Sequence, residues 1–370
     1  MSREEFEKFH IDRSLQKNYK KVSYLSKADK IIETLKDTFT FEKFEKEFLV
    51  KPVKSTRNNS VIDALQSYKH ILESEGRLKS RDTFQGTINW MKKFSEKKLP
   101  SWDVVNPAYL KKLDEFMKEK NLSDSSIGIY MRNLRTVFNI AISDKVVGQD
   151  LYPFGRNRYT PPATRNIKKA LSLEDIQKLY TYTPESEQES WAKDLWFFSY
   201  FANGLNIKDI CLLKFSNLRE SEIQFTRQKT KNSRKANLQN ISVVLIDDLK
   251  TILSRRAKKN GTPNDFVFDL LSSKSTQEEI YKTVNQTVKT VNKYMNRIAG
   301  KLKLNRLPTT NFARHSYSTV LKRAGVPIEM ISENLGHSSI RTTQIYLDSF
   351  EKEQRLEAAK HLLAFKDVDK

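Results

Sequence analysis

Helical periodicity is the feature that most constrains how this chain folds. From residue 60 to residue 147, apolar residues recur at helical spacing in four successive segments. The last segment begins after Ser123, a favoured N-cap residue, and its apolar face runs from Ile127 to Ala141. The other three are Val61–Leu72, Thr83–Phe94 and a helix opened by Pro107. The pattern predicts a four-helix domain whose core lies along these apolar faces.

The residues after 170 predict a second domain that is mainly α, with one small β element. Ser172 begins a capping-box pattern. Helices are expected over Trp191–Phe201, Asp247–Lys259 and Thr276–Leu302. Glu222–Thr226 and Ile241–Leu245 have the composition of two strands of a hairpin, and the segment Arg227–Asn237 between them holds five basic residues and no acidic one. We therefore expect an α-rich domain that carries a small β-sheet in the form of a basic hairpin.

Changes in composition divide the chain into five parts. Residues 1–55 are a charged, helical N-terminal extension, and residues 56–150 are the four-helix domain. Residues 151–170 combine prolines with basic residues, which is typical of an extended interdomain linker. Residues 171–350 form the second domain, and residues 351–370 are a tail with an amphipathic helical stretch.

The charge of the chain indicates a polyanionic partner. The formal net charge is +21, and the basic residues are spread along the chain. Nucleic acid is the first expectation, although a basic surface kept for solubility would have the same composition. The single cysteine, Cys211, excludes an intrachain disulfide framework and a cysteine-rich zinc site. No apolar stretch reaches the roughly 18 residues of a membrane span, and the first residues lack the apolar region of a signal peptide. We expect an intracellular protein without a membrane partner.

The stretch Arg306–Leu347 carries the residues with the most specific chemistry. It has the pattern of three short helices separated by glycines: Asn311–Arg323, Ile328–Leu335, and one that ends near Tyr346. Glycine ends a helix readily because it adopts the left-handed conformation at little cost. The helix ends and joints of this stretch are therefore the expected position of a functional site.

Arg314, His337 and Tyr346 stand at these joints. Arginine presents a planar, permanently charged fork that matches two phosphate oxygens. Histidine donates hydrogen bonds near neutral pH, and a tyrosine hydroxyl acts as a covalent nucleophile when its neighbours stabilise the developing charge. Singly, each has an ordinary reading as a solvated arginine, a capping histidine or a core tyrosine. Together they predict phosphoryl transfer in which the protein becomes the temporary ester.

Two segments of this stretch, NFARHSYSTVLKRAG and ENLGHSSIRTTQIYL, resemble the C-terminal signature of the tyrosine recombinases, the phage integrase family. The resemblance extends more weakly from about residue 60 to residue 347. It implies a SAM-like core-binding domain over residues 56–150 and an α-rich catalytic domain over residues 171–350. It also implies an enzyme, a site-specific DNA recombinase that integrates or excises a mobile element. The alternatives are a relaxing type IB topoisomerase and a DNA-binding relative that no longer cuts.

The resemblance also assigns chemical roles. Tyr346 would attack a DNA phosphodiester, forming a 3′-phosphotyrosyl bond and releasing a 5′-hydroxyl. Arg314 would hold the non-bridging oxygens and His337 would hydrogen-bond the phosphate. Lys229, from the Lys-Thr pair in the basic hairpin, would protonate the departing oxygen. The other reading of Lys229 is a lysine that only contacts backbone phosphate.

Two positions depart from the family pattern. Asn206 stands where the first catalytic arginine is usual, and Asn311 stands where a histidine is usual, three residues before the second. An amide donates a hydrogen bond but brings no charge, and charge-assisted bonds are about twice as strong as neutral ones. Arg227, two residues before Lys229, is our hypothesis for a compensating charge. His315 cannot simply replace Asn311, because neighbouring residues on a helix point about 100° apart.

Basic residues in several segments are the predicted DNA contacts. They are Arg227, Lys231, Arg234 and Lys235 in the hairpin, Lys79 and Arg81 on an expected loop, Arg132 and Arg135 on the fourth helix, and His315. Most such phosphate contacts position a protein without reading bases. The reaction needs no cofactor because bond energy is kept in the ester, and no ligand spacing indicates a metal. The expected partners are double-stranded DNA, a homotetramer on paired sites, and accessory DNA-bending or directionality proteins. The expected location is the cytoplasm, at the nucleoid.

Overall fold

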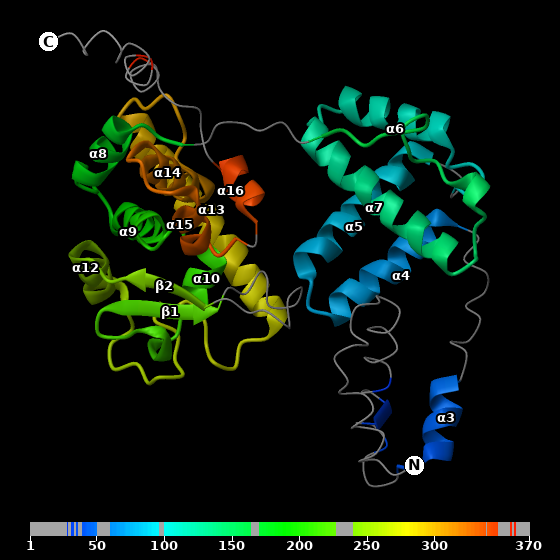
Figure 1. Cartoon of the computed structure of the whole chain (residues 1–370), viewed down its shortest axis with the longest axis horizontal. Coiled ribbons are helices and arrows are strands. Elements are labelled where there is room, and N and C mark those ends of the chain that lie inside the picture. Colours follow the sequence, from blue (N-terminus) through cyan, green and yellow to red (C-terminus); the bar gives the residue numbers. More distant parts are fainter. Residues whose placement is uncertain are drawn as a thin grey trace, which may run out of the picture. The chain divides into compact units, whose positions relative to one another are not determined.

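The computed structural model describes two compact units. The described residues are 39–49, 60–95, 100–163, 170–226, 240–337 and 339–346, together with Ala28, Ile31, Ile32, Leu35, Leu356 and Ala359. The first unit comprises Met1–Lys69 with Thr83–Pro161, and the second comprises His70–Asp82 with Pro162–Lys370. Helices and strands carry the labels of Figure 1.

The helices expected between residues 60 and 147 are all present. They are α4 (Val61–Ser74), α5 (Leu78–Ser95), α6 (Pro107–Glu119) and α7 (Asp124–Ser143), preceded by α3 (Phe41–Leu49). Ser123 caps α7 as predicted, because its side chain accepts a hydrogen bond from the backbone N–H of Ser126. Met91, Leu110 and Phe138 are fully buried, which places the core along the predicted apolar faces.

Lys79 and Arg81 lie in the first turn of α5, so their predicted placement on a loop is wrong. The reason is Gly76, whose φ of +67° ends α4 abruptly. Its N–H donates to the carbonyl of Glu73, and the chain turns within a few residues so that α5 begins at Leu78. The start of this helix predicted from the sequence, Thr83, is therefore five residues too late.

The segment after α7 is folded where an extended linker was expected. Gln149–Leu151 form a 3-10 turn, and Phe154 and Tyr159 are buried and joined by a parallel bridge. The hydroxyl of Tyr159 donates to the carboxylate of Asp114 at 2.6 Å. Aromatic side chains therefore hold this segment against the first unit as far as residue 159, despite its prolines.

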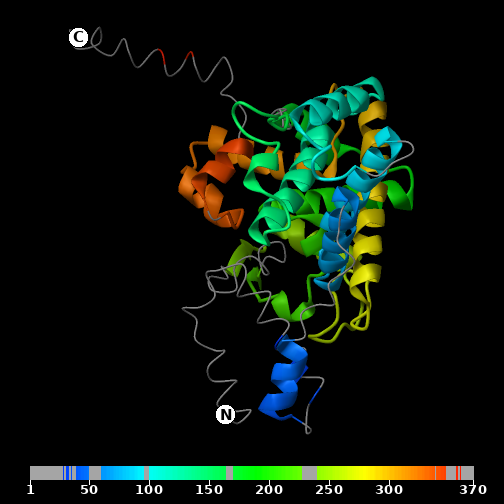
Figure 2. The ribbon, with the colours of Figure 1, turned by 90° about the vertical axis from the view of Figure 1, so that its right-hand side faces the viewer.

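The second unit is mainly helical and contains one hairpin. Its elements are α8 (Leu173–Thr181), α9 (Glu187–Phe201), α10 (Ile207–Cys211), the 3-10 helix Phe215–Asn217, β1 (Glu222–Thr226), β2 (Asn240–Val244), α12 (Asp247–Arg256), α13 (Gln277–Lys301), α14 (Thr310–Arg323), α15 (Ile328–Asn334) and α16 (Ile340–Tyr346). The antiparallel strands pair Glu222 with Val244 and Thr226 with Asn240. α13 is the longest described helix and is visible along its length in Figure 2. The mainly α architecture with a small hairpin agrees with the sequence analysis.

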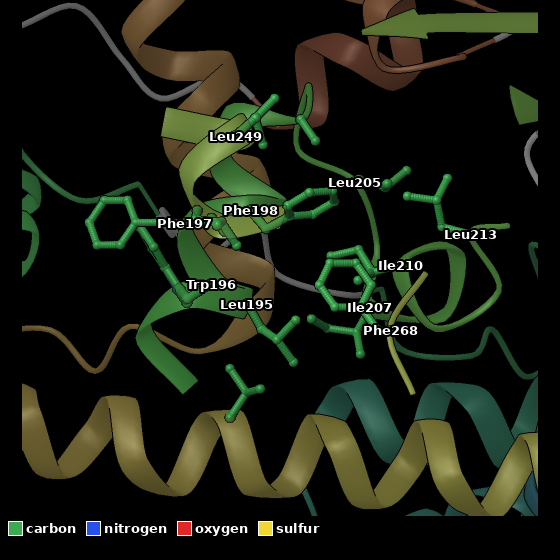
Figure 3. Packing of buried hydrophobic residues seen from close by; sticks show 14 of the residues in the cluster. Leu195, Trp196, Phe197, Phe198, Leu205, Ile207, Ile210, Leu213, Leu249 and Phe268 are labelled. Atoms are coloured by element: carbon green, nitrogen blue, oxygen red, sulfur yellow. The ribbon is translucent and has the colours of Figure 1, made fainter. Parts of the chain in front are cut away.

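α9 is the centre of the second core. Leu195, Trp196, Phe197 and Phe198 are all buried, so apolar residues cover every side of the second half of this helix (Figure 3). It contacts α12, α13 and α14. A helical segment that is apolar on every side has to lie inside a domain, and the site described below is built on the C-terminal end of α9.

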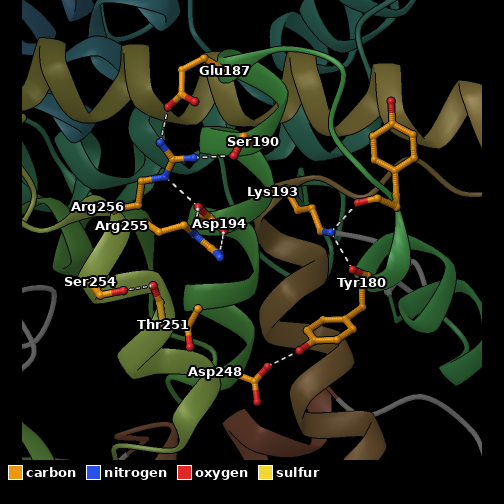
Figure 4. Close-up of polar contacts among 11 residues, drawn as sticks. Tyr180, Glu187, Ser190, Lys193, Asp194, Asp248, Thr251, Ser254, Arg255 and Arg256 are labelled. Carbon is orange, nitrogen blue, oxygen red and sulfur yellow. Dashed lines mark hydrogen bonds and ion pairs between the residues drawn. The ribbon is translucent and has the colours of Figure 1, made fainter.

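An ion-pair network fixes α12 to α9 (Figure 4). Asp194 on α9 accepts from Arg255 at 2.6 Å and from Arg256 at 2.7 Å, and Arg256 also contacts Glu187 and Ser190. α12 ends at residue 256, three residues earlier than predicted, because Ala257 forms a bridge with the segment around residue 268. Within the described residues, no helix combines the length and the apolar character that crossing a membrane requires.

Candidate active site

Three segments fix the start of α14, the helix that carries Arg314. The indole N–H of Trp196 donates to the carbonyl of Thr309 at 3.1 Å, and the N–H of Thr310 donates to the side chain of Asn292 at 2.8 Å. The N–H of Leu171 donates to the hydroxyl of Ser316 at 2.9 Å. Because α9, α13 and the segment before α8 all bind it, α14 presents its arginine from a rigid base.

Arg314 is 5% exposed, and two backbone carbonyls orient its guanidinium. Nη1 donates to Gly204 O at 2.7 Å, and Nη2 donates to Leu335 O at 2.8 Å. Gly204 belongs to the turn between α9 and α10, and Leu335 is the C-cap residue of α15. Carbonyl dipoles hold a cation in place without carrying a net opposite charge, so this arrangement suits a guanidinium that must also bind an anion.

Gly204 permits the close approach between this turn and α14. Its φ is +65°, and a Cβ atom at this position would lie 2.9 Å from Cγ and 3.0 Å from Cα of Arg314. Only glycine satisfies both the left-handed backbone and the contact. The glycine of the Asn-Gly-Leu-Asn sequence is therefore part of the site.

His337 lies directly against Arg314. The ring is 8% exposed, its Nε2 is 2.9 Å from Arg314 Nη2, and its Nδ1 is 3.0 Å from Thr343 Oγ1. A guanidinium donates only, so Nε2 is the acceptor, and the ring proton is therefore on Nδ1 and is donated to Thr343. The structure thus fixes the tautomer of a neutral His337 and aims its acceptor nitrogen at the guanidinium.

Tyr346 is the last residue of α16, the helix that carries Thr343 three residues earlier. Residues three apart lie on neighbouring positions of one helical face. α16 contacts both α14 and α15, the helices that hold Arg314 and lead to His337. The side chain of Tyr346 lies outside the described residues.

The remaining predicted catalytic residues are placed as follows. Asn206 is partly buried and lies two residues beyond Gly204, immediately before α10. Asn311 is exposed in the first turn of α14, three residues before Arg314. Lys229 lies outside the described residues, as do the predicted DNA contacts Arg227, Lys231, Arg234 and Lys235 in the β1–β2 connection.

The other predicted DNA contacts lie on helices. Lys79 and Arg135 are exposed, whereas Arg132 and His315 are half-buried. Arg81 is also half-buried and forms ion pairs with Asp82 at 2.9 Å and Glu73 at 3.4 Å. These carboxylates compete with phosphate for its guanidinium.

Two parts of the site are not predicted from the sequence. The hydroxyl of Thr343 fixes the tautomer of His337, and the carbonyl of Gly204 holds Arg314. Spacing offered a signal for Thr343, which stands three residues before Tyr346 on one helical face. Among the residues that the structure describes, no group of three or more His, Cys, Asp and Glu side chains has the geometry of a metal site.

The chain has two helical domains. The second buries an arginine against a histidine, and these precede a helix that ends in a tyrosine. This combination defines the tyrosine recombinase class of enzymes. The sequence profile described as the Phage integrase SAM-like domain matches residues 60–160, and the profile of the Phage integrase family matches residues 169–353. The chain belongs to the phage integrase family. This family consists of site-specific recombinases.

Relatives and solved structures agree with this membership. Tyrosine recombinase XerA of Pyrococcus furiosus is 25% identical over 284 residues, which are 77% of this chain and 88% of that protein. A tyrosine recombinase of Thermosipho africanus is 28% identical over 270 residues, which are 70% of this chain and 86% of the relative.

Among solved structures, the Tn1549 transposon integrase with a circular intermediate DNA gives a TM-score of 0.55 at 17% identity, covering 81% of this chain and 99% of that one. A lambda integrase(75-356) dimer bound to a COC′ core site gives 0.56 at 17% identity, covering 78% and 97% respectively. These similarities show the fold.

Proposed function

We propose that this chain is an integrase that cuts and rejoins specific DNA sites through a 3′-phosphotyrosyl intermediate on Tyr346. The observation that carries the proposal is the buried pair of Arg314 and His337, 2.9 Å apart and bound through Thr343 to the helix that ends at Tyr346. The Tn1549 integrase structure contains a circular intermediate DNA, the lambda integrase dimer is bound to a COC′ core site, and the charge of +21 suits the same kind of partner.

In the proposed reaction the guanidinium of Arg314 turns from His337 toward the phosphate. Its Nη2 then donates to a non-bridging oxygen, while Gly204 O continues to hold Nη1. The hydroxyl of Tyr346 loses its proton to solvent, and its oxygen forms a bond to phosphorus as the bond from phosphorus to the 5′ oxygen breaks. Lys229 gives a proton to that 5′ oxygen. Attack by the 5′-hydroxyl of a second strand reverses these steps, so one phosphodiester is exchanged for another.

His337 has a specific task in this proposal. While Nε2 accepts from Arg314, it cannot donate to the phosphate. Entry of the phosphate takes over the hydrogen bond that Arg314 Nη2 donates. Nε2 then takes up a proton from solvent, which makes the ring a donor on both sides. The bond from Nδ1 to Thr343 keeps the ring in place during this exchange.

The neutral side chains of Asn206 and Asn311 weaken the pocket in this proposal. Loss of one preorganised donor costs on the order of 10²–10³ in rate. We propose that Arg227 supplies part of the missing charge from the β1–β2 connection. In a single-turnover assay, Arg227→Ala should therefore slow cleavage without abolishing DNA binding, and an unchanged rate would remove this role.

The proposed partner is double-stranded DNA, bound by both domains. Lys79 and Arg135 are the best-placed phosphate contacts on α5 and α7 because both are exposed, whereas Arg81 must first leave its carboxylates. We also propose a homotetramer on two paired sites, accessory DNA-bending or directionality proteins, and location at the nucleoid. These proposals rest on the resemblance to the recombinases of this family.

The test is covalent trapping on a DNA substrate nicked beside the cleavage site, so that the short fragment bearing the released 5′-hydroxyl diffuses away after attack. Because the target sequence has to be known, sites are first selected from random DNA by binding. Wild-type protein should become linked to DNA, and Tyr346→Phe should not, although it binds equally well. Binding without any adduct would instead support a relative that no longer cuts, which Asn206 and Asn311 make the second candidate.

A recombinase and a topoisomerase differ in which 5′-hydroxyl attacks the 3′-phosphotyrosyl bond: that of a second strand in a recombinase, and that of the original strand in a topoisomerase. Relaxation of a supercoiled plasmid carrying one site, without exchange between two sites, would assign the topoisomerase activity. Exchange that requires two sites would assign recombination.

A further inference from the structure

A buried phenol joins two asparagines beside the arginine pocket. The hydroxyl of Tyr317 donates to Asn203 Oδ1 at 3.0 Å and accepts from Asn334 Nδ2 at 3.1 Å. Tyr317 is 9% exposed, and its ring packs against Ile331 and Leu335. The hydroxyl therefore contributes two hydrogen bonds in addition to the apolar packing of the ring.

The direction of these bonds is fixed from one end. Asn203 Nδ2 donates to the carbonyl of Ser242 at 3.0 Å, and a carbonyl only accepts. Asn203 Oδ1 must then face Tyr317 and accept the hydrogen bond from its hydroxyl, which leaves a lone pair of the phenol oxygen to accept from Asn334. Burial raises the pKa of Tyr317 to about 12, so the hydroxyl keeps this proton at neutral pH.

Each of the two asparagines is next in sequence to a residue whose carbonyl binds Arg314. Asn203 immediately precedes Gly204, and Asn334 immediately precedes Leu335. The carbonyls of Gly204 and Leu335 are the two acceptors of the Arg314 guanidinium.

Tyr317 itself stands three residues after Arg314 on α14, on neighbouring positions of one helical face. We infer that the hydroxyl of Tyr317 positions the guanidinium of Arg314, by tying together the two backbone segments whose carbonyls hold it. Tyr317 is thus a positioning residue, since it reaches the reacting phosphate only through Arg314.

The network extends to the hairpin. Ser242 lies on β2, and β2 contacts α15, the helix that ends at Asn334. The β1–β2 connection includes Lys229, the proposed general acid. The same hydrogen bonds therefore link β2, the strand that follows this connection, to the arginine pocket. A displacement of the hairpin should then also displace the guanidinium of Arg314.

Asn203 is suited to this junction for a second reason. Its φ is +53°, a left-handed conformation that asparagine tolerates better than other residues with side chains. Gly204 follows with φ of +65°, so two successive left-handed residues form the turn after α9. The side chain of Asn203 fixes this turn by hydrogen bonds to Tyr317 and to Ser242 on β2, both outside the turn.

The primary test observes Arg314 directly and does not require cleavage. The protein is labelled with ¹⁵N-arginine and studied by NMR. Slow rotation about the Nε–Cζ bond of Arg314 gives separate Nη1 and Nη2 signals, which are assigned by their loss in Arg314→Lys. Tyr317→Phe keeps the ring but removes the hydroxyl, and the signals should average. The matched control is Tyr159→Phe, which removes another buried phenolic hydrogen bond, to Asp114, from the first unit. Averaging in both variants, or in neither, would overturn the inference.

A second test rests on the proposed function. At saturating DNA, Tyr317→Phe should form the covalent adduct about tenfold or more slowly, since small misplacement of a catalytic group is costly. Its Kd for DNA should stay within about twofold of the wild-type value, as expected for an effect on rate alone.

Asn334→Leu should have the same effect on the adduct rate, and the double variant should be no slower than either single one, because both remove the same network. Additive losses would overturn the inference. If wild-type protein forms no adduct, the proposed function fails, and the NMR comparison still decides the role of Tyr317.

Discussion

Gly204→Ala gives the sharpest test of the arginine pocket, because the structure specifies what the added methyl meets. A Cβ at residue 204 would lie 2.9 Å from Cγ, 3.0 Å from Cα and 3.2 Å from Cβ of Arg314. The second of these atoms belongs to the backbone of α14, which three segments hold in place. The side chain of Arg314 is itself bound at both ends of its fork. The turn, and with it the carbonyl of residue 204, therefore has to move.

Two terms set the size of the effect. Alanine in the left-handed conformation costs about 1–2 kcal/mol, and overpacking costs typically about 1–3 kcal/mol. We therefore expect Gly204→Ala to lower the free energy of unfolding by about 2–5 kcal/mol. The moved carbonyl no longer aligns Arg314, and a displacement approaching 1 Å costs up to about 10²-fold in rate.

The matched control is Gly325→Ala. Gly325 has φ of +80°, but a Cβ there would have no described atom within 4 Å. It therefore imposes the backbone strain alone, for about 1–2 kcal/mol, and should leave the rate unchanged. Urea unfolding gives the stability and single-turnover adduct formation on a nicked substrate gives the rate. Equal stability losses in the two variants, with equal cleavage rates, would refute the packing argument.

Three further predictions concern other contacts. Thr343→Val should slow adduct formation about tenfold because it leaves the Nδ1 proton of His337 unbound, at a cost of about 1–3 kcal/mol, whereas Thr343→Ser should retain the rate. Asp194→Asn should lower the free energy of urea unfolding by about 3 kcal/mol, since it leaves two arginines without their buried carboxylate, and it should not alter the cleavage rate of folded protein. Burial acts to raise the pKa of Glu189, but hydrogen bonds from Lys301 and a backbone N–H prevail and hold it below its ordinary value of 4.5. The ionised carboxylate of Glu189 therefore contributes to the free energy of unfolding above pH 4.5. This contribution is lost as the pH falls through the pKa of Glu189 in the folded state. Wild-type protein should therefore lose stability more steeply on acidification than Glu189→Gln, and parallel curves would contradict this.

Local signals in the sequence predict much of the secondary structure. Ser123 and Ser172 cap the helices that follow them, because their hydroxyls satisfy N–H groups that a helix leaves open. The alternation of Glu222–Thr226 marks a strand because its side chains face opposite sides. These features depend on neighbours within a few residues. For the same reason the start of α5 was missed, since the left-handed turn at Gly76 is invisible to apolar periodicity.

The site depends on contacts that no local pattern contains. Their positions at the helix joints identify Arg314 and His337 in the sequence. The distance of 2.9 Å between Nη2 and Nε2, and the tautomer of the ring, follow from the packing of α14, α15 and α16. Tyr317 reads as a core residue of an amphipathic helix, and its hydroxyl acquires a role only through Asn203 and Asn334. Backbone carbonyls give even less signal, because every residue has one.

The wide spacing of the arginine's acceptors has a consequence for synthesis on the ribosome. One carbonyl comes from 110 residues before Arg314 and the other from 21 residues after it. A nascent chain therefore has no complete pocket until Leu335 has emerged, and the tyrosine follows later still. Fragments left by interrupted translation or by proteases within this span lack a component of the machinery. The order of the segments along the chain thus prevents an unfinished copy of this recombinase from holding the arginine in its final position.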